Sequence, residues 1–209
     1  MSPDHYFSMQ PSTDDARRVL AVRLAGRNVQ VDVASGVFSP SRVDLGTRVL
    51  LRTIPPLPDV AAHVLDLGCG WGPLALTMGL QAPSATIWAV DVNERALDLT
   101  RGNAARLHLG NIRTALPDDV PVAVRFAQIW SNPPIRVGKE ALHEMLLRWL
   151  PRLTPGGVAY LVIQRHLGAD SLHRWLAEAL AVPMPGVTVE REGSAKGYRV
   201  LTVHAGPAR

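Results

Sequence analysis

The chain has 209 residues, of which 47% are hydrophobic and 19% are charged, so it is long enough for one well-buried globular domain. No apolar run is long enough to span a membrane and no export signal is visible, so we expect a cytoplasmic protein. The single cysteine, Cys69, excludes an internal disulfide. The net charge of +4 favours a polyanionic partner only weakly, because the basic residues are scattered along the chain.

The first 58 residues are predicted to form an extension that packs on the main domain, residues 59–209. Apolar and polar residues alternate over 19–24 and 29–33, a pattern typical of a hairpin. A helix is predicted over 44–54, and the proline-rich segment 55–58 should act as a stiff connector.

The most informative stretch begins with the apolar run 64–67, which predicts a buried parallel strand. Gly68, Gly70 and Gly72 follow at alternate positions, where they allow a sharp turn and leave the backbone open to a ligand. Pro73 then stands at a favourable first position of a helix. This pattern predicts a strand, a ligand-binding turn and a helix.

Two acidic residues accompany the glycines. Asp66 precedes them, and Asp91 ends the next predicted strand. In an open α/β sheet the carboxyl ends of parallel strands meet at the edge where ligands bind, and a carboxylate there can accept both hydroxyl hydrogens of a ribose. The spacing differs from the dinucleotide fingerprint Gly-x-Gly-x-x-Gly, since Pro73 occupies the place of its last glycine. We therefore expect a nucleoside site without a pyrophosphate.

The rest of the chain alternates strands and helices. Asn93 can cap a helix, and two strands close the chain around a hairpin at 193–197. The predicted strands are 112–116, 126–130, 158–163, 187–191 and 199–204, and the predicted helices are 94–109, 138–153 and 170–181. This order predicts an α/β, Rossmann-like fold whose parallel sheet is finished by an antiparallel strand.

The motif Asn132-Pro133-Pro134 directly follows one of these strands, at the predicted ligand edge. An amine attached to a π system is a poor nucleophile, because its lone pair is delocalised. Two acceptors that bind its hydrogens, here the Asn132 side-chain oxygen and the Pro133 carbonyl, can hold the nitrogen pyramidal and aim its lone pair. Two prolines stiffen this loop in advance. The motif therefore indicates transfer of a group to an exocyclic amine.

Asp66-x-Gly-x-Gly-x-Gly72 resembles motif I of class I S-adenosylmethionine (SAM) methyltransferases, and Val90-Asp-Val92 resembles their ribose motif. With Ser131-Asn-Pro-Pro-Ile-Arg-Val-Gly-Lys139, the chain is similar to RsmC-type ribosomal RNA guanine-N2 methyltransferases and their single-domain homologues. The resemblance implies SAM as cofactor, a seven-stranded sheet, and ribosomal RNA or a ribosomal subunit as partner. It implies that Asn132, Pro133 and Pro134 are catalytic. The cofactor-binding residues that we expect are Asp66, Gly68, Cys69, Gly70, Gly72, Asp91, Val92 and Asp118.

Substrate contacts are expected just beyond the two prolines. Many relatives have an aromatic residue there that stacks on the target base, whereas this chain has Ile135. Arg136 can stack its guanidinium on a base instead, and Lys139 can neutralise a phosphate. Trp71, inside the glycine loop, is a candidate to cover bound SAM. No His or Cys spacing resembles a metal site.

Three alternatives stay open at this point. The same Asn-Pro-Pro chemistry serves adenine N6 in nucleic acids and glutamine N5 in proteins. The chain could instead be a non-catalytic RNA-binding module with a methyltransferase fold, or methylate a small molecule, although its basic charge disfavours the last.

Overall fold

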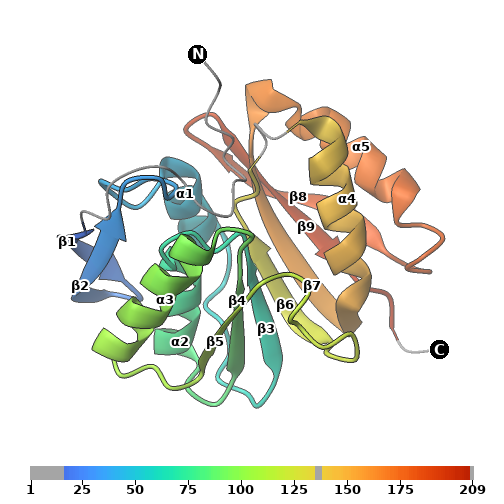
Figure 1. The fold of residues 1–209 in the computed structure, drawn as a ribbon. Coiled ribbons are helices and arrows are strands. Elements are labelled where there is room, and N and C mark those ends of the chain that lie inside the picture. The colour runs from blue at the N-terminus through green and yellow to red at the C-terminus, as the bar shows by residue number, and fades with distance from the viewer. Residues whose placement is uncertain (1–16, 135–137, 208–209) are drawn as a thin grey trace. The chain divides into compact units, whose positions relative to one another are not determined.

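The computed structural model describes residues 17–134 and 138–207 (Figure 1). Two compact units make up the chain, the first from Met1–Asp44 and Leu57–Val122, the second from Leu45–Pro56 and Ala123–Arg209. Neither unit is continuous in sequence. In the described ranges, no helix is long and apolar enough to cross a membrane.

The first unit begins with an antiparallel hairpin of β1 (Arg17–Leu24) and β2 (Arg27–Ala34). A turn of two residues joins the strands, with φ of 46° at Ala25 and 78° at Gly26. Positive φ at both positions matches the right-handed twist of the paired strands. The predicted hairpin is confirmed, with longer strands and a tighter turn than the sequence pattern indicated.

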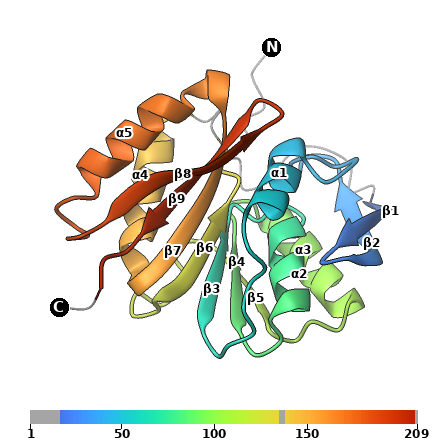
Figure 2. The same ribbon diagram turned by 180° about the vertical axis from the view of Figure 1, so that it is seen from behind.

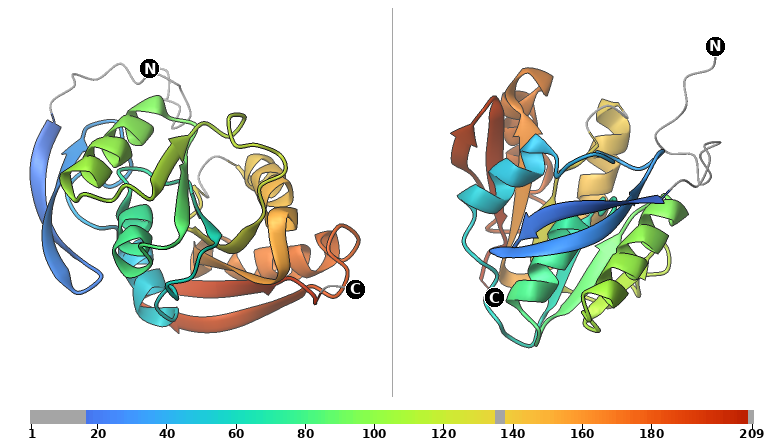
Figure 3. Two further views of the ribbon diagram at one scale, coloured as in Figure 1. Left: turned by 90° about the horizontal axis from the view of Figure 1, so that it is seen from below. Right: turned by 90° about the vertical axis from the view of Figure 1, so that its left-hand side faces the viewer.

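Three parallel strands form the sheet of the first unit, in the order β5-β4-β3. Helices α2 and α3 lie on one face of these strands, and the hairpin packs on the outer side of the helices (Figure 3). The bounds are β3 (His63–Leu67), α2 (Pro73–Gln81), β4 (Thr86–Val90), α3 (Glu94–Arg106) and β5 (Ile112–Ala115). A buried cluster that includes Leu24, Val31, Trp71, Leu76 and Leu99 fills the space between hairpin and helices.

One buried polar side chain joins these layers. Asn103 of α3 donates from Nδ2 to the carbonyls of Asp32 and Trp71, at 2.9 and 3.0 Å. Its Oδ1 accepts from the Asp32 N–H at 2.6 Å. The amide thus ties strand β2 and the glycine loop to one helix, and all three of these bonds reach backbone groups.

The second unit holds four strands in the order β6-β7-β9-β8. Strands β6 and β7 are parallel, whereas β9 is antiparallel to both of its neighbours. Helix α1 covers one face and helices α4 and α5 cover the other (Figures 1 and 2), which explains why nearly all of β9 is buried. The bounds are α1 (Leu45–Thr53), β6 (Phe126–Ser131), α4 (Lys139–Trp149), β7 (Leu153–Gln164), α5 (Ala169–Ala179), β8 (Thr188–Ala195) and β9 (Tyr198–His204), with 3-10 turns at Leu150–Arg152 and Arg165–Leu167.

The predicted fold class is confirmed: an α/β protein with a mostly parallel seven-stranded sheet and an antiparallel strand at its C-terminal end. The strand predicted over 158–163 is longer in the structure, because residues 155–157 also belong to the twelve-residue strand β7. The final hairpin turns at Lys196 and Gly197 rather than over 193–197. The predicted boundary between residues 58 and 59 stays a prediction.

We expect Asn103→Asp to destabilise the protein by roughly 2–4 kcal/mol, because a carboxylate cannot donate to the two carbonyls that the amide satisfies. Urea unfolding of the variant measures this loss. Asn28→Asp, at the exposed end of the β1–β2 hairpin, is the matched control. Equal stability of the two variants would contradict the joining role of Asn103.

Candidate active site

The glycine loop follows β3 in the first unit. The N–H groups of Gly68 and Cys69 both donate to the carbonyl of Val90, at 2.8 and 3.0 Å, so the loop is tied to the end of β4. Gly68, Gly70 and Gly72 have φ of 78°, 57° and 94°, values that residues with a side chain rarely adopt.

Gly72 and Gly70 differ in the room that their surroundings leave for a side chain. A Cβ on Gly72 would lie 2.9 Å from the hydroxyl oxygen of Thr100, so a side chain does not fit there. A Cβ on Gly70 would meet nothing within 4 Å. The backbone at Gly70 is therefore accessible to a ligand, as the sequence pattern predicted.

Asp91, just after β4, holds the middle of the loop. Its Oδ2 accepts the Gly70 N–H at 2.9 Å, and its Oδ1 accepts the Asn93 N–H at 3.0 Å. Burial raises the pKa of Asp91, and N–H groups of Asn93, Gly70 and Val92 act in the opposite direction. Asn93 caps α3 as predicted, since its side chain accepts the Arg95 N–H.

Asp66 is the second acid of this site and is almost fully buried in β3. Its Oδ2 accepts the Ala75 N–H in the first turn of α2 at 2.8 Å, while its Oδ1 has no hydrogen-bond partner in the described part of the chain. Burial raises the pKa of Asp66 to about 8; the Ala75 N–H opposes this shift and the charge of Asp91 adds to it. A cationic ligand would favour the ionised carboxylate.

Cys69 is a buried free thiol whose Sγ lies 3.7 Å from the Thr100 hydroxyl oxygen. Burial and the charges of Asp91 and Asp66 raise its pKa well above the ordinary value. The protonated thiol is a poor nucleophile, so the residue fits the role of a small side chain in a tight turn.

Other predicted residues of this region differ in exposure. Val92 is half-buried, and Asp118 is exposed in a turn that follows β5. Trp71 does not cover the loop: only 1% of its surface is exposed, and its indole N–H donates to the Ser39 carbonyl at 3.3 Å. The expectation that Trp71 shields bound SAM was therefore wrong, because the hydrophobic core under the hairpin takes up the ring.

The second unit contains the Asn-Pro-Pro motif. Asn132 follows the last residue of β6, and its Nδ2 donates to the Thr47 hydroxyl at 3.2 Å. Thr47 is buried in α1, and Pro133 is buried as well. Thr47 was not among the predicted site residues, because it precedes Asn132 by 85 residues in the chain.

Pro134 is half-buried beside Pro133, and Lys139 is exposed at the first position of α4. The predicted substrate contacts Ile135 and Arg136 lie outside the described residues. Within the described ranges, no group of three or more His, Cys, Asp or Glu side chains could hold a metal ion.

The donor set of the first unit suits SAM. Its ammonium and sulfonium are cations, and a positive charge nearby favours the ionised form of the two acids, Asp66 and Asp91, whose pKa values burial raises. The open backbone at Gly70 leaves room for a nucleoside beside the loop, and Oδ1 of Asp66 has no hydrogen-bond partner among the described residues.

Comparisons with known proteins agree with this geometry. The family model of the methyltransferase small domain matches residues 28–200. An uncharacterised protein of Bacillus subtilis, YbxB, is 35% identical over 178 residues, 84% of this chain and 88% of its own. The ribosomal RNA small subunit methyltransferase C of Ectopseudomonas mendocina is 32% identical over 183 residues, 81% of this chain and 54% of its own.

A similar solved structure is that of the T. thermophilus 16S rRNA N2 methyltransferase RsmC, in complex with AdoMet, which is SAM, and guanosine. It superimposes with a TM-score of 0.74 at 24% identity, over 95% of this chain and 52% of its own. This chain thus spans about half the length of the named RsmC proteins.

Fold and site together define a class I methyltransferase. The chain belongs to the methyltransferase small domain family, and its methyl donor is SAM. The predicted resemblance and the predicted cofactor are confirmed.

The raised pKa of Asp66 predicts a pH effect on stability. At a pH between 3.8, the ordinary pKa of an aspartate, and about 8, the pKa of Asp66 in the folded protein, the folded protein keeps a proton that the unfolded chain has lost. The contribution of this group to stability is therefore complete below the lower value and is lost as the pH rises through the higher one, by up to about 1.4 kcal/mol per pH unit.

We expect Asp66→Asn to remove this slope, because the amide can still accept the Ala75 N–H but carries no charge. Urea unfolding without SAM, from pH 5 to pH 8.5, compares the variant with the parent protein. Asp119→Asn, at an exposed position, is the matched control. Parallel curves for parent and Asp66→Asn would show that Asp66 is ionised throughout.

Proposed function

We propose that this enzyme methylates an exocyclic amine of RNA, namely N2 of a guanine in small-subunit ribosomal RNA. The observation that carries the proposal is the hydrogen bond from Asn132 Nδ2 to Thr47. It fixes the orientation of the amide, so Nδ2 faces the helix and Oδ1 is the end that we assign to the substrate amine.

The first unit has the task of binding the cofactor. When bound, SAM supplies an electrophilic methyl group on a sulfonium. Asp91 would accept hydrogen bonds from the two ribose hydroxyls, and the charge of Asp66 would favour the cationic tail. The Gly70 backbone allows close approach, and its N–H bond to Asp91 keeps the carboxylate in place before the ligand arrives.

The second unit has the task of activating the amine. Asn132 Oδ1 and the Pro133 carbonyl would each accept one N–H of the amine, which draws the nitrogen toward a pyramidal geometry and frees its lone pair to attack the methyl group. Burial of Pro133 and the rigid ring of Pro134 limit the motion of this loop. The residues act by position and electrostatics, and the methylated amine loses its proton to solvent afterwards.

The choice of guanine in ribosomal RNA rests on the relatives. RsmC of T. thermophilus is described as a 16S rRNA N2 methyltransferase and was solved with guanosine. The Ectopseudomonas relative is also a small-subunit ribosomal RNA methyltransferase. The basic charge of this chain is compatible with such a substrate.

Transfer of labelled methyl groups from SAM tests the proposed function. The substrates are ribosomal RNA and both ribosomal subunits, from a strain that lacks the protein. We expect label in N2-methylguanosine of the small-subunit RNA. Label in N6-methyladenosine, or in protein and no RNA, would contradict the proposed substrate.

Two variants separate the roles of the units. Asn132→Ala should lower turnover by about 10²–10³-fold with nearly unchanged SAM affinity, because it removes an acceptor needed in the transition state. Asp91→Ala should weaken SAM binding by roughly 10–100-fold, because it removes charged hydrogen bonds. Calorimetry and saturation kinetics measure the two effects.

Asn28→Ala, at the exposed end of the hairpin, controls for unspecific effects of losing an amide. If both site variants lost only SAM affinity, the assignment of the amine to Asn132 would fail.

A further inference from the structure

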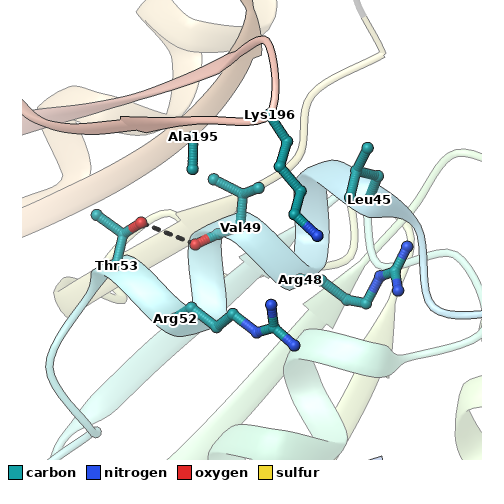
Figure 4. Close-up of a pocket in the computed structure, with 7 residues that line it drawn as sticks. All are labelled: Leu45, Arg48, Val49, Arg52, Thr53, Ala195 and Lys196. Carbon is teal, nitrogen blue, oxygen red and sulfur yellow. Dashed lines mark hydrogen bonds between the residues drawn. The ribbon is translucent and has the colours of Figure 1, made fainter.

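A small hollow in the second unit is surrounded by positive charge. Arg48 and Arg52 reach it from α1, and Lys196 reaches it from the β8–β9 hairpin (Figure 4). The hollow measures about 60 Å³. It lies between segments that are nearly 150 residues apart in sequence, so no local pattern could have revealed it.

The three cations are exposed and have no acidic partner within 4 Å among the residues that the structure describes. Arg48 and Arg52 are four residues apart and so share one face of α1, an arrangement of like charges that disfavours a helix. The charge of this face can be offset by an anion from outside.

The other lining residues add no negative charge. Leu45, Val49 and Ala195 form apolar walls, and the Thr53 hydroxyl donates to the Val49 carbonyl at 2.9 Å. Among these lining side chains, those of Arg48, Arg52 and Lys196 are therefore the ones that can donate hydrogen bonds to a ligand. Such a donor set fits an oxyanion.

The backbone at Lys196 has a conformation that is unusual for a lysine. Lys196 has φ of 50° and is followed by Gly197 at 81°, so a lysine occupies a left-handed turn position that glycine or asparagine favours. At Gly193 of β8, a Cβ would lie 2.8 Å from the Thr53 side chain, so the hairpin packs closely on α1.

Helix α1 connects this hollow to the proposed amine site. Thr47, which binds the Asn132 amide, directly precedes Arg48 in the helix. An RNA strand whose base is presented to Asn132 carries phosphates on both sides of that base, and α1 contains both Thr47 and the two arginines.

We propose that Arg48, Arg52 and Lys196 form a binding site for backbone phosphates of the substrate RNA. This inference rests on the proposed function, since it assumes that the substrate is RNA. Phosphate contacts carry no sequence information: they position the strand and supply salt-dependent affinity.

The test compares two double variants of equal charge. Arg48→Gln with Arg52→Gln removes two charges of the hollow. Arg27→Gln with Arg174→Gln removes two exposed arginines, from the β1–β2 hairpin and from α5. Binding to transcribed small-subunit ribosomal RNA is measured by fluorescence anisotropy over a range of salt concentrations, and SAM binding by calorimetry.

We expect the variant of the hollow to bind RNA roughly tenfold more weakly and to lose about one unit of salt slope for each phosphate contact. Its KM for RNA should rise, while kcat at saturating RNA and its affinity for SAM stay unchanged. Lys196→Asn, which suits the turn, should give about half of this effect. The control should stay close to the parent protein.

If the parent protein methylates RNA, equal losses of RNA affinity in both double variants, or no loss in either, would overturn the inference. A parent protein that methylates no RNA would instead refute the proposed function, and the inference with it. A loss of affinity for assembled subunits but not for naked RNA would also overturn the inference, because such a result would indicate contact with a ribosomal protein.

Discussion

The candidate cofactor site depends on one carboxylate, that of Asp91. Its two oxygens accept backbone N–H groups of Gly70 and Asn93, at 2.9 and 3.0 Å. One side chain therefore fixes both the glycine loop after β3 and the residue that caps α3. Because burial raises its pKa, the charged form is costly in the free protein, and a ligand with two hydroxyl groups or a cation offsets that cost.

The charges of the two units suit different ligands. The acids of the first unit, Asp66 and Asp91, favour a cationic nucleoside and would repel a polyanion. The second unit has an amide oriented by Thr47 and, on the same helix, arginines without acidic partners in the described part of the chain. The acids of the first unit suit a positively charged methyl donor, and the arginines of the second unit suit a negatively charged RNA.

The local parts of the site could be predicted from sequence. A strand, three alternate glycines and a following acid each depend on neighbours in the chain, so the β3–α2–β4 region and the cap at Asn93 were predicted correctly. The fold class followed from the order of strands and helices. The Asn-Pro-Pro motif was visible for the same reason.

Contacts between distant segments could not be predicted. Trp71 belongs to a core that forms only when the hairpin packs on α2 and α3, so its burial left no local pattern. The contact between Thr47 and Asn132 spans 85 residues. The hollow near Lys196 depends on the close approach of α1 to Gly193, which needs the fold itself.

The proposed roles of Asp91 and Asn132 are tested most directly by a crystal structure of the chain with S-adenosylhomocysteine and guanosine. We expect the ribose hydroxyls of the cofactor product to bind Asp91, and the guanine N2 to donate to Asn132 Oδ1 and the Pro133 carbonyl. A cofactor bound away from Asp91, or a guanosine whose N2 does not contact Asn132, would contradict these roles.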